Sequence, residues 1–355
     1  MISVYIHIPF CTNICTYCDF PKFYKNNEFT KKYLIELKKE INRYYKGEKV
    51  KTLYFGGGTP SSLNLEELET LFEIIKVFNL DKNVEITFEC NPEDLIEEKL
   101  NFLKNKVNRL SIGVQSFNPK FLKLLGRKKV NIENIILAKK YFNNINIDLM
   151  YGFNKQKKED LKKDIATVLK LDIPHISAYS LILEKNTKLY IDGYKIKEDD
   201  ILDKFLKKEL SKTFNHYEIS NYAKEGYESK HNLTYWNNEH YYGFGLGASG
   251  YIDNLRYDNT RSLNKYLDGN YRLEENILDK NETLQNEFIL GFRKINGINK
   301  KTFKQKYNFD IKDIKIIRNL LDKKQLLENE TNIYINPKYI YLSNELLLNF
   351  LETIY

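Results

Sequence analysis

The 355-residue sequence contains only four cysteines and no long uncharged apolar run. Because the cysteine count is small and three of the four crowd into one short segment, a disulfide framework is not expected. The missing apolar run excludes a membrane-spanning helix. Residues 1–10 also lack the cationic stretch and cleavage site of a secretory signal peptide. These absences, with clustered reduced thiols, predict a cytoplasmic protein.

The three clustered cysteines, Cys11, Cys15 and Cys18, form a C-x3-C-x2-C motif, whereas Cys90 lies far along the chain. Three thiolates on one loop can each bind one iron of a [4Fe–4S] cube and leave the fourth iron open to a ligand. A zinc site usually has four ligands, with a second Cys or His pair, and no such pair follows. His7, the nearby alternative, lies in an alternating apolar run that predicts a strand. The spacing therefore favours an iron–sulfur cluster.

The net charge of +8 is a modest excess of 56 Lys and Arg over 48 Asp and Glu. Much of the lysine lies in stretches that also contain acids, such as residues 155–163, and this mixture is typical of a solvated helix face. A basic excess spread so widely is no strong nucleic-acid signal. RNA and peripheral contact with an anionic membrane stay open as alternatives, as do a monomer and a homodimer.

The first half of the chain predicts strands that alternate with helices. The strands are expected at residues 3–9, 51–55, 84–89, 109–114, 145–150 and 175–181. This alternation predicts parallel βα units. Several polar residues and glycines follow the strand ends: the cysteines, the Gly-Gly-Gly-Thr-Pro run at residues 56–60, Glu89 and Gln115. In barrels the carboxyl ends of the strands form the reactive face, so we expect one shared site there.

The pattern changes after about residue 185. A helix is expected at 198–213 and a short strand at 217–220, followed by a turn-rich, aromatic-rich stretch that includes a glycine run at 243–251. From residue 282 the sequence predicts helices and turns. Short strands at 332–335 and 338–342 and a last helix at 343–352 complete this region. No internal repeats stand out.

These motifs resemble the radical S-adenosylmethionine superfamily, in particular its HemN/HemW branch. The resemblance rests on residues 5–11 with the next two cysteines, on residues 56–60, 111–117 and 146–152, and it extends over essentially the whole chain. It implies an α/β fold: a partial (β/α)6 barrel at 1–225, a connecting segment at 226–281 and a small winged-helix-like α+β domain at 282–355. It also implies S-adenosylmethionine on the open iron, cleaved reductively to methionine and a 5′-deoxyadenosyl radical with a reductant such as flavodoxin or ferredoxin.

The resemblance further implies which residues contact S-adenosylmethionine. They are Tyr5, Tyr17, Gly57, Gly58, Thr59, Glu89, Gln115, Arg127, Asp148 and Ile182. Carboxylates such as Asp148 can accept from ribose hydroxyls or an ammonium group, and Arg127 can pair with a carboxylate. Taken alone, the glycine run would fit a plain tight turn, and Arg127 in its lysine-rich surroundings would fit a solvated cation.

Two features bear on the position within the branch. The coproporphyrinogen dehydrogenases carry a further cysteine two positions after the third, where this sequence has Phe20. His231, Tyr235 and Trp236 match the H-N-x-x-Y-W motif of the heme-chaperone members. A neutral imidazole is a natural axial ligand of heme iron, and the two aromatic residues could stack on a porphyrin. In isolation His231 would be interpreted as a structural histidine.

The resemblance therefore predicts a protein that binds heme and delivers it to acceptor hemoproteins. The main alternative is an oxygen-independent coproporphyrinogen III oxidase, a true enzyme that decarboxylates propionates through substrate radicals. A weaker one is a radical enzyme that acts on RNA or another substrate. The sequence leaves open whether the radical chemistry is used in heme transfer.

Overall fold

A single twelve-stranded sheet forms the body of the protein, in the order β14-β13-β12-β11-β1-β4-β5-β6-β7-β8-β10-β9. The computed structural model describes residues 1–196 and 200–351. Six neighbouring strands run parallel and follow chain order: β1 (Ile2–Ile8), β4 (Val50–Gly57), β5 (Leu80–Cys90), β6 (Arg109–Gln115), β7 (Ile145–Tyr151) and β8 (His175–Ser180). The prediction of parallel βα units is confirmed.

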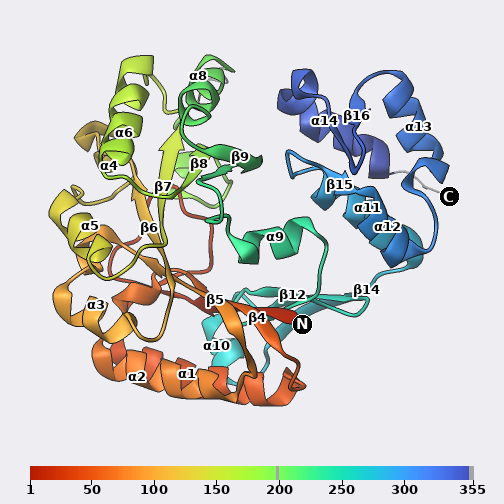
Figure 1. Cartoon of the computed structure of the whole chain (residues 1–355). Coiled ribbons are helices and arrows are strands. Elements are labelled where there is room, and N and C mark those ends of the chain that lie inside the picture. The colour runs from red at the N-terminus through yellow and green to blue at the C-terminus, as the bar shows by residue number, and fades with distance from the viewer. Residues whose placement is uncertain (197–199, 352–355) are drawn as a thin grey trace.

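Helices cover the outer face of the parallel strands, as Figure 1 shows. They are α1 (Asn27–Tyr44), α2 (Leu65–Ile74), α3 (Glu97–Leu103), α4 (Pro119–Leu124), α5 (Ile132–Lys139) and α6 (Lys158–Lys170). α2 begins with Asn64 and Glu67 exchanging side-chain to backbone hydrogen bonds in a capping box. The curved sheet with its helical cover is the partial barrel of the predicted fold class.

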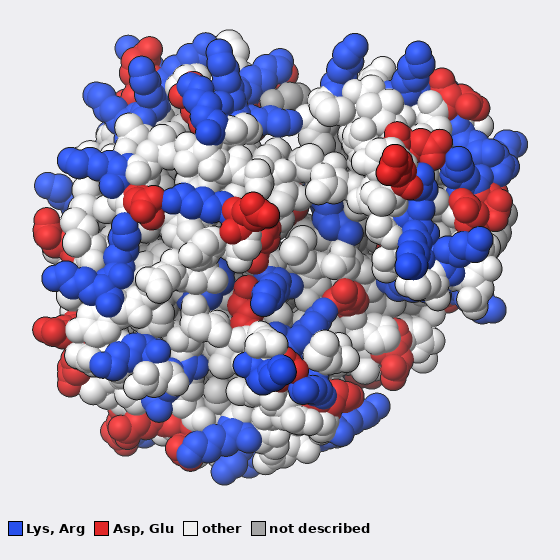
Figure 2. All heavy atoms as spheres, viewed as in Figure 1, with Lys and Arg blue, Asp and Glu red and all other residues white. Residues whose placement is uncertain are grey.

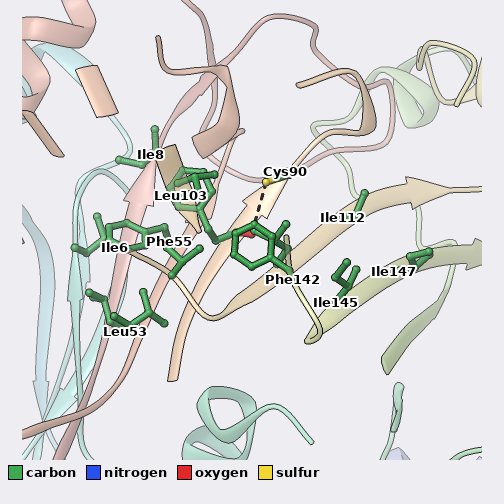
Figure 3. Close-up of a cluster of buried hydrophobic side chains, with 14 of the residues drawn as sticks. Ile6, Ile8, Leu53, Phe55, Cys90, Leu103, Ile112, Phe142, Ile145 and Ile147 are labelled. Carbon is green, nitrogen blue, oxygen red and sulfur yellow. Dashed lines mark hydrogen bonds between the residues drawn. The ribbon is translucent and has the colours of Figure 1, made fainter. Parts of the chain in front are cut away.

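Alternate residues of each parallel strand point to opposite faces, and the two faces differ in chemistry. Outward-facing side chains such as Ile6, Phe55 and Ile112 are buried in the layer between strands and helices (Figure 3). Each contributes about 1.5–3 kcal/mol through burial. Inward-facing residues are largely polar and hydrogen-bond to one another; Thr52 of β4, for example, donates to Ser3 of the neighbouring β1 over 2.8 Å. The barrel therefore has an apolar coat and a polar interior.

The segment at 226–281 extends this sheet. Its first strand, β11 (Tyr241–Phe244), runs parallel to β1. The next three are antiparallel: β12 (Ser249–Ile252), β13 (Leu255–Asn259) and β14 (Arg272–Ile277). At the opposite edge lie β9 (Asn215–Glu218) and β10 (Asn221–Ala223). Where the sequence predicts a helix at 198–213, α8 covers Asp200–Leu210, and residues 198–199 lie outside the described residues.

A second, smaller core belongs to a C-terminal module that Figure 1 shows beside the barrel. Its helices are α11 (Lys280–Gly291), α12 (Lys300–Tyr307), α13 (Lys315–Asp322) and α14 (Ser343–Leu348). Its strands are β15 (Ile298–Asn299), β16 (Leu326–Glu328) and β17 (Asn332–Ile335). Three strands with helices packed on them make this an α+β module, as predicted.

The strand predicted at 338–342 is wrong, because Pro337–Leu342 forms a 3-10 helix. Pro337 supplies the fixed φ that suits the first helical position, and the Asn336 side chain caps the turn by accepting from the Lys338 N–H. Of the helix predicted at 343–352, α14 accounts for the first six residues, and residue 352 lies outside the described residues.

Charged residues of both signs are mixed over the surface that Figure 2 shows, with dense Lys and Arg over α6 and α8. Pairs such as Lys204 with Asp200, four residues apart on α8, are typical of a solvated helix face. Among the helices in residues 1–196 and 200–351, none is both long enough and apolar enough to cross a membrane.

Candidate functional site

A cavity of about 590 Å³ opens at the carboxyl ends of the parallel strands. Most residues that the sequence predicts for the site line it together: Cys11, Cys15, Tyr17, Cys18, Gly57, Gly58, Thr59, Glu89, Gln115, Arg127, Asp148 and Ile182. Tyr5 is absent from this lining. It lies beneath the cavity inside the barrel, where its hydroxyl hydrogen-bonds His7 Nδ1 over 3.0 Å. The expected shared site is therefore a single cavity.

The cysteine loop is fastened to two neighbouring segments. Thr16 donates its N–H to the Leu125 carbonyl over 3.0 Å and its hydroxyl to the Leu124 carbonyl over 2.8 Å. The Thr16 carbonyl accepts from Leu189 N–H over 3.0 Å. These bonds hold the loop between the end of α4 and the short helix α7 (Lys188–Ile191).

The donor set at this loop fits a cluster. Across the described ranges, no three His, Cys, Asp or Glu side chains converge closely enough to hold a single metal ion. The three thiols border one cavity, and in a [4Fe–4S] cube each thiolate binds a different iron. Burial raises the pKa of the Cys11 thiol to about 11. Iron binding must therefore supply the energy that deprotonates this thiol.

Glycines after β4 bring the backbone close to the cysteine loop. Gly57 has φ +118°, and a Cβ there would lie 2.7 Å from the His7 ring. At Gly58 a Cβ would lie 2.9 Å from Cys11 Sγ. Only glycine permits both the left-handed backbone and this approach. The run is thus a cradle beside the cysteine loop, with Thr59 Oγ1 3.5 Å from Cys11 Sγ.

Two half-buried carboxylates, Glu89 and Asp148, face the same space. Glu89 accepts from the Tyr54 hydroxyl over 2.8 Å and from Gly57 N–H over 3.2 Å. Burial, reinforced by repulsion from Asp148, raises the pKa of Glu89 to about 7. Burial also raises the pKa of Asp148, against the hydrogen bond that it accepts from Asn146 over 2.7 Å. The pair makes the cavity floor favourable for a positively charged ligand group.

Arg127 closes another side of the cavity. Its guanidinium lies 3.4 Å from Cys15 Sγ, donates to Asn91 Oδ1 over 2.8 Å, and also donates to the Gly113 carbonyl. This side chain is therefore held in place beside Cys15. Gln115 has φ +68°, a conformation that costs a non-glycine residue about 1 kcal/mol or more and that concentrates at functional sites.

The H-N-x-x-Y-W residues lie elsewhere, on α9 (Lys230–Trp236), which closes the amino-terminal end of the barrel. His231 is 1% exposed. Its Nδ1 lies 2.8 Å from the Thr52 hydroxyl and its Nε2 lies 2.7 Å from the Tyr235 hydroxyl. Burial lowers the pKa of His231 to about 3, so the ring is neutral. Trp236, at the end of the helix, lies beside Glu218.

The start of α9 is fixed by Glu85 of β5. Its carboxylate accepts from Lys230 N–H over 3.1 Å and from His231 N–H over 3.0 Å. These first-turn N–H groups have no partner within a helix, so an acceptor there satisfies them. In Figure 1 α9 lies between the barrel and the C-terminal module. The structure thus separates the two predicted groups of ligand residues to opposite ends of one barrel.

Comparison with known proteins decides the family. Residues 5–168 match the model of the radical SAM superfamily. The heme chaperone HemW of Lactococcus lactis is 37% identical, over 98% of this chain and 97% of that protein, and HemW of Bacillus subtilis is 38% identical over 99% of each. The chain belongs to the HemW family. The structure of coproporphyrinogen III oxidase (HemN) from Escherichia coli, 21% identical, superposes with a TM-score of 0.83 over 98% of this chain and 89% of that one, which shows a shared fold.

HemW proteins are radical SAM proteins, and this family implies a [4Fe–4S] cluster, S-adenosylmethionine and a reductant. The three cysteines would hold the cluster, and when bound the two groups supply reductive cleavage of S-adenosylmethionine. The glycine cradle and Thr59 bring the backbone close to Cys11. Glu89 and Asp148 offer acceptors to hydroxyl and cationic groups, and Arg127 is placed beside Cys15.

Sequence reasoning missed several residues of the HemW cavity. They include Asn91, Met150 and Tyr179, which line it from the ends of β5, β7 and β8. Each sits within two residues of a predicted strand end, the signal that could have found them. Phe20 and Ile182 also line the cavity, and both are about two-thirds exposed, at 65% and 66%. Cys90 borders the cavity but faces the apolar layer, 3.9 Å from the Phe88 carbonyl (Figure 3).

Proposed function

We propose that this HemW-family chain binds heme and hands it to acceptor hemoproteins, while carrying a [4Fe–4S] cluster and S-adenosylmethionine in the cavity at the carboxyl end of its barrel. The observation that carries this proposal is the likeness to proteins named heme chaperone over nearly the whole length of both chains. Phe20, in place of the extra cysteine of the dehydrogenases, supports it. Because the cluster requires reduced thiols, the protein works in the cytoplasm, with a flavodoxin or ferredoxin as reductant.

The proposed heme ligand is His231, and its hydrogen bonds define what binding requires. Thr52 gives its hydroxyl proton to Ser3, so it accepts from His231 Nδ1–H. The ring lone pair is therefore on Nε2, which accepts a hydrogen bond from the Tyr235 hydroxyl. Iron coordination at Nε2 therefore requires Tyr235 to give up this bond and α9 to move away from the barrel end.

Heme titration of the anaerobically reconstituted full-length protein tests this assignment. We expect His231→Ala to lose the axial-imidazole absorption spectrum of the complex. The matched control is His240→Ala, because His240 is an exposed imidazole that packs edge-on against Tyr251. Tyr235→Phe should bind heme at least as tightly as the wild type, since it frees Nε2. An unchanged spectrum in the His231 variant would reject His231 as the ligand.

The same preparation should be offered coproporphyrinogen III, S-adenosylmethionine and a reductant. We expect no protoporphyrinogen IX. Its formation would show the oxidase activity of the alternative function. Heme delivery would then not be the whole function of the protein. Transfer is checked separately by mixing the heme-loaded protein with an apo-hemoprotein and following the acceptor's spectrum.

A further inference from the structure

The glycine run at residues 243–251 lies against the cysteine loop, outside the cavity. Gly247 has φ +66°, and a Cβ there would overlap the Pro21 ring. The Pro21 carbonyl accepts from His7 Nε2 over 2.8 Å. Pro21, three residues after Cys18, is therefore held on one side by a barrel strand and on the other by a segment more than 220 residues away in the sequence.

Arg261, from the stretch that follows the glycine run, holds Asp19, two residues before Pro21. Arg261, two residues after β13, donates to the Asp19 carbonyl and lies 3.8 Å from the Asp19 carboxylate. Lys22 donates to the carbonyls of Cys18 and Phe20. The arm from Cys18 to Pro21 thus has carbonyls engaged by His7, Lys22 and Arg261, with Gly247 packed against its end.

A buried carboxylate anchors this segment to α1. Glu40, 0% exposed, accepts from Gly245 N–H over 2.8 Å, from Asn259 Nδ2 over 2.6 Å and from the Tyr266 hydroxyl over 2.6 Å. A buried carboxylate is tolerated only when it is hydrogen-bonded in this way. Gly245 and Asn259, each two residues before Gly247 and Arg261 respectively, are therefore both fixed to Glu40 of α1.

We propose that residues 245–261, anchored on Glu40, form a clamp on the Cys18–Pro21 arm, and that Arg261 is a positioning residue for the corner of the cluster that Cys18 ligates. This inference rests on the cluster that family membership implies and is independent of heme binding. A cluster held by three thiolates loses iron when one ligand arm moves away. The clamp restricts that movement from outside the cavity.

Chelator challenge of the reconstituted full-length protein tests the clamp. We expect Arg261→Met to incorporate the cluster and then to release iron about fivefold faster than wild type, the effect of one lost hydrogen bond to the loop. Its reduced cluster should also show a changed electron paramagnetic resonance line shape with S-adenosylmethionine bound. Arg261→Lys, which keeps a charged donor, should recover part of both effects. Lys265→Met, at an exposed lysine on the nearby α10 (Leu263–Leu267), should match wild type.

Gly247→Ala supplies a second variant, because its Cβ would push against Pro21, and we expect faster iron release again. If this variant fails to fold, the half-exposed Arg261 still decides the matter. Wild-type iron release and line shape in Arg261→Met would overturn the proposal. Heme binding should stay unchanged in these variants. Loss of heme binding with an intact cluster would contradict the independence of the clamp from the heme site.

Discussion

The two ends of the barrel are built from the same strands but differ in what their polar groups face. At the carboxyl end, glycines keep the backbone close and leave a cavity beside the cysteines. At the amino end, α9 covers the opening, and His231 has a partner at each ring nitrogen. Polar groups that pair with one another stabilise the fold, whereas polar groups left facing a cavity are available to a ligand.

Two glutamates on β5 show this difference on one strand. Glu85 and Glu89 lie four residues apart, so both side chains point into the barrel. Glu85 is satisfied by the first N–H groups of α9. Glu89 lies at the cavity, where burial and Asp148 raise its pKa to about 7. The four predictions that follow test whether the two ends respond differently to comparable changes.

The largest effect is expected at the cysteines. Cys18→Ala should abolish cluster assembly, because the cube then loses one of its three protein ligands. Cys90→Ala should retain the cluster, because that thiol faces the apolar layer although it borders the same cavity. Iron and acid-labile sulfide analysis with the visible absorption spectrum checks both variants. Equal loss in the two would mean that Cys90 serves the cluster.

At the closed end the expected loss is in stability. His231→Ala should lower the free energy of unfolding of the cluster-free protein by about 2–4 kcal/mol, since it removes the acceptor of the Tyr235 hydroxyl and the donor to the Thr52 hydroxyl and creates a cavity. His240→Ala, at the surface, should change it by less than about 0.5 kcal/mol. Chemical denaturation measures both. A small loss in the His231 variant would contradict the role of His231 in holding α9 on the heme-free barrel.

The two glutamates should respond with opposite sign. In the ligand-free protein at pH 8, Glu85→Gln should destabilise by about 1 kcal/mol, because a charged acceptor at a helix start is lost. Glu89→Gln should stabilise by about 1–2 kcal/mol, since it removes a carboxylate whose ionisation burial opposes. Denaturation curves at matched pH measure both changes. Destabilisation by both substitutions would contradict the predicted difference between Glu85 and Glu89.

The last prediction is a pH dependence at Glu89. Glu89 ionises with a pKa of about 7, and S-adenosylmethionine carries a permanent sulfonium charge. Its affinity for the reconstituted protein should therefore rise about tenfold from pH 6 to pH 8, in proportion to the ionised fraction. In the ligand-free protein Glu89 contributes stability that is fully present below its ordinary pKa of 4.5 and is lost as pH rises through about 7. Glu89→Gln should flatten both profiles in calorimetric titrations and melting curves.

Most of the barrel could be predicted because local sequence patterns encode its strands and helices. Each parallel strand is a short apolar run followed by a helix, and its functional residues sit at its end, as with Gln115. Strands β11 to β14 could not be predicted as part of the sheet, because glycines and aromatics there pack against residues distant in sequence, as Gly245 does with Glu40. Local sequence does not record such partners.

The candidate site shows the same limit. Strand ends brought the cavity residues together, but the depth of a side chain inside the barrel depends on register. Tyr5 lies one inward position below His7, which places it under the cavity. The H-N-x-x-Y-W motif indicates relatives that share these residues but does not predict their burial. The burial of His231 follows from the docking of α9 on β4 and β5.

The position of β1 between β4 and β11 has a consequence for biosynthesis. β1 leaves the ribosome long before β11, yet its pairing with β11 joins Tyr5 to Gly243. The contacts of Pro21 with Gly247 and of Asp19 with Arg261 must wait for the same late residues. For most of translation the nascent chain therefore carries its three cluster cysteines on a loop without its outer supports. The outer contacts of the cysteine loop can therefore form only after residue 261 has been made.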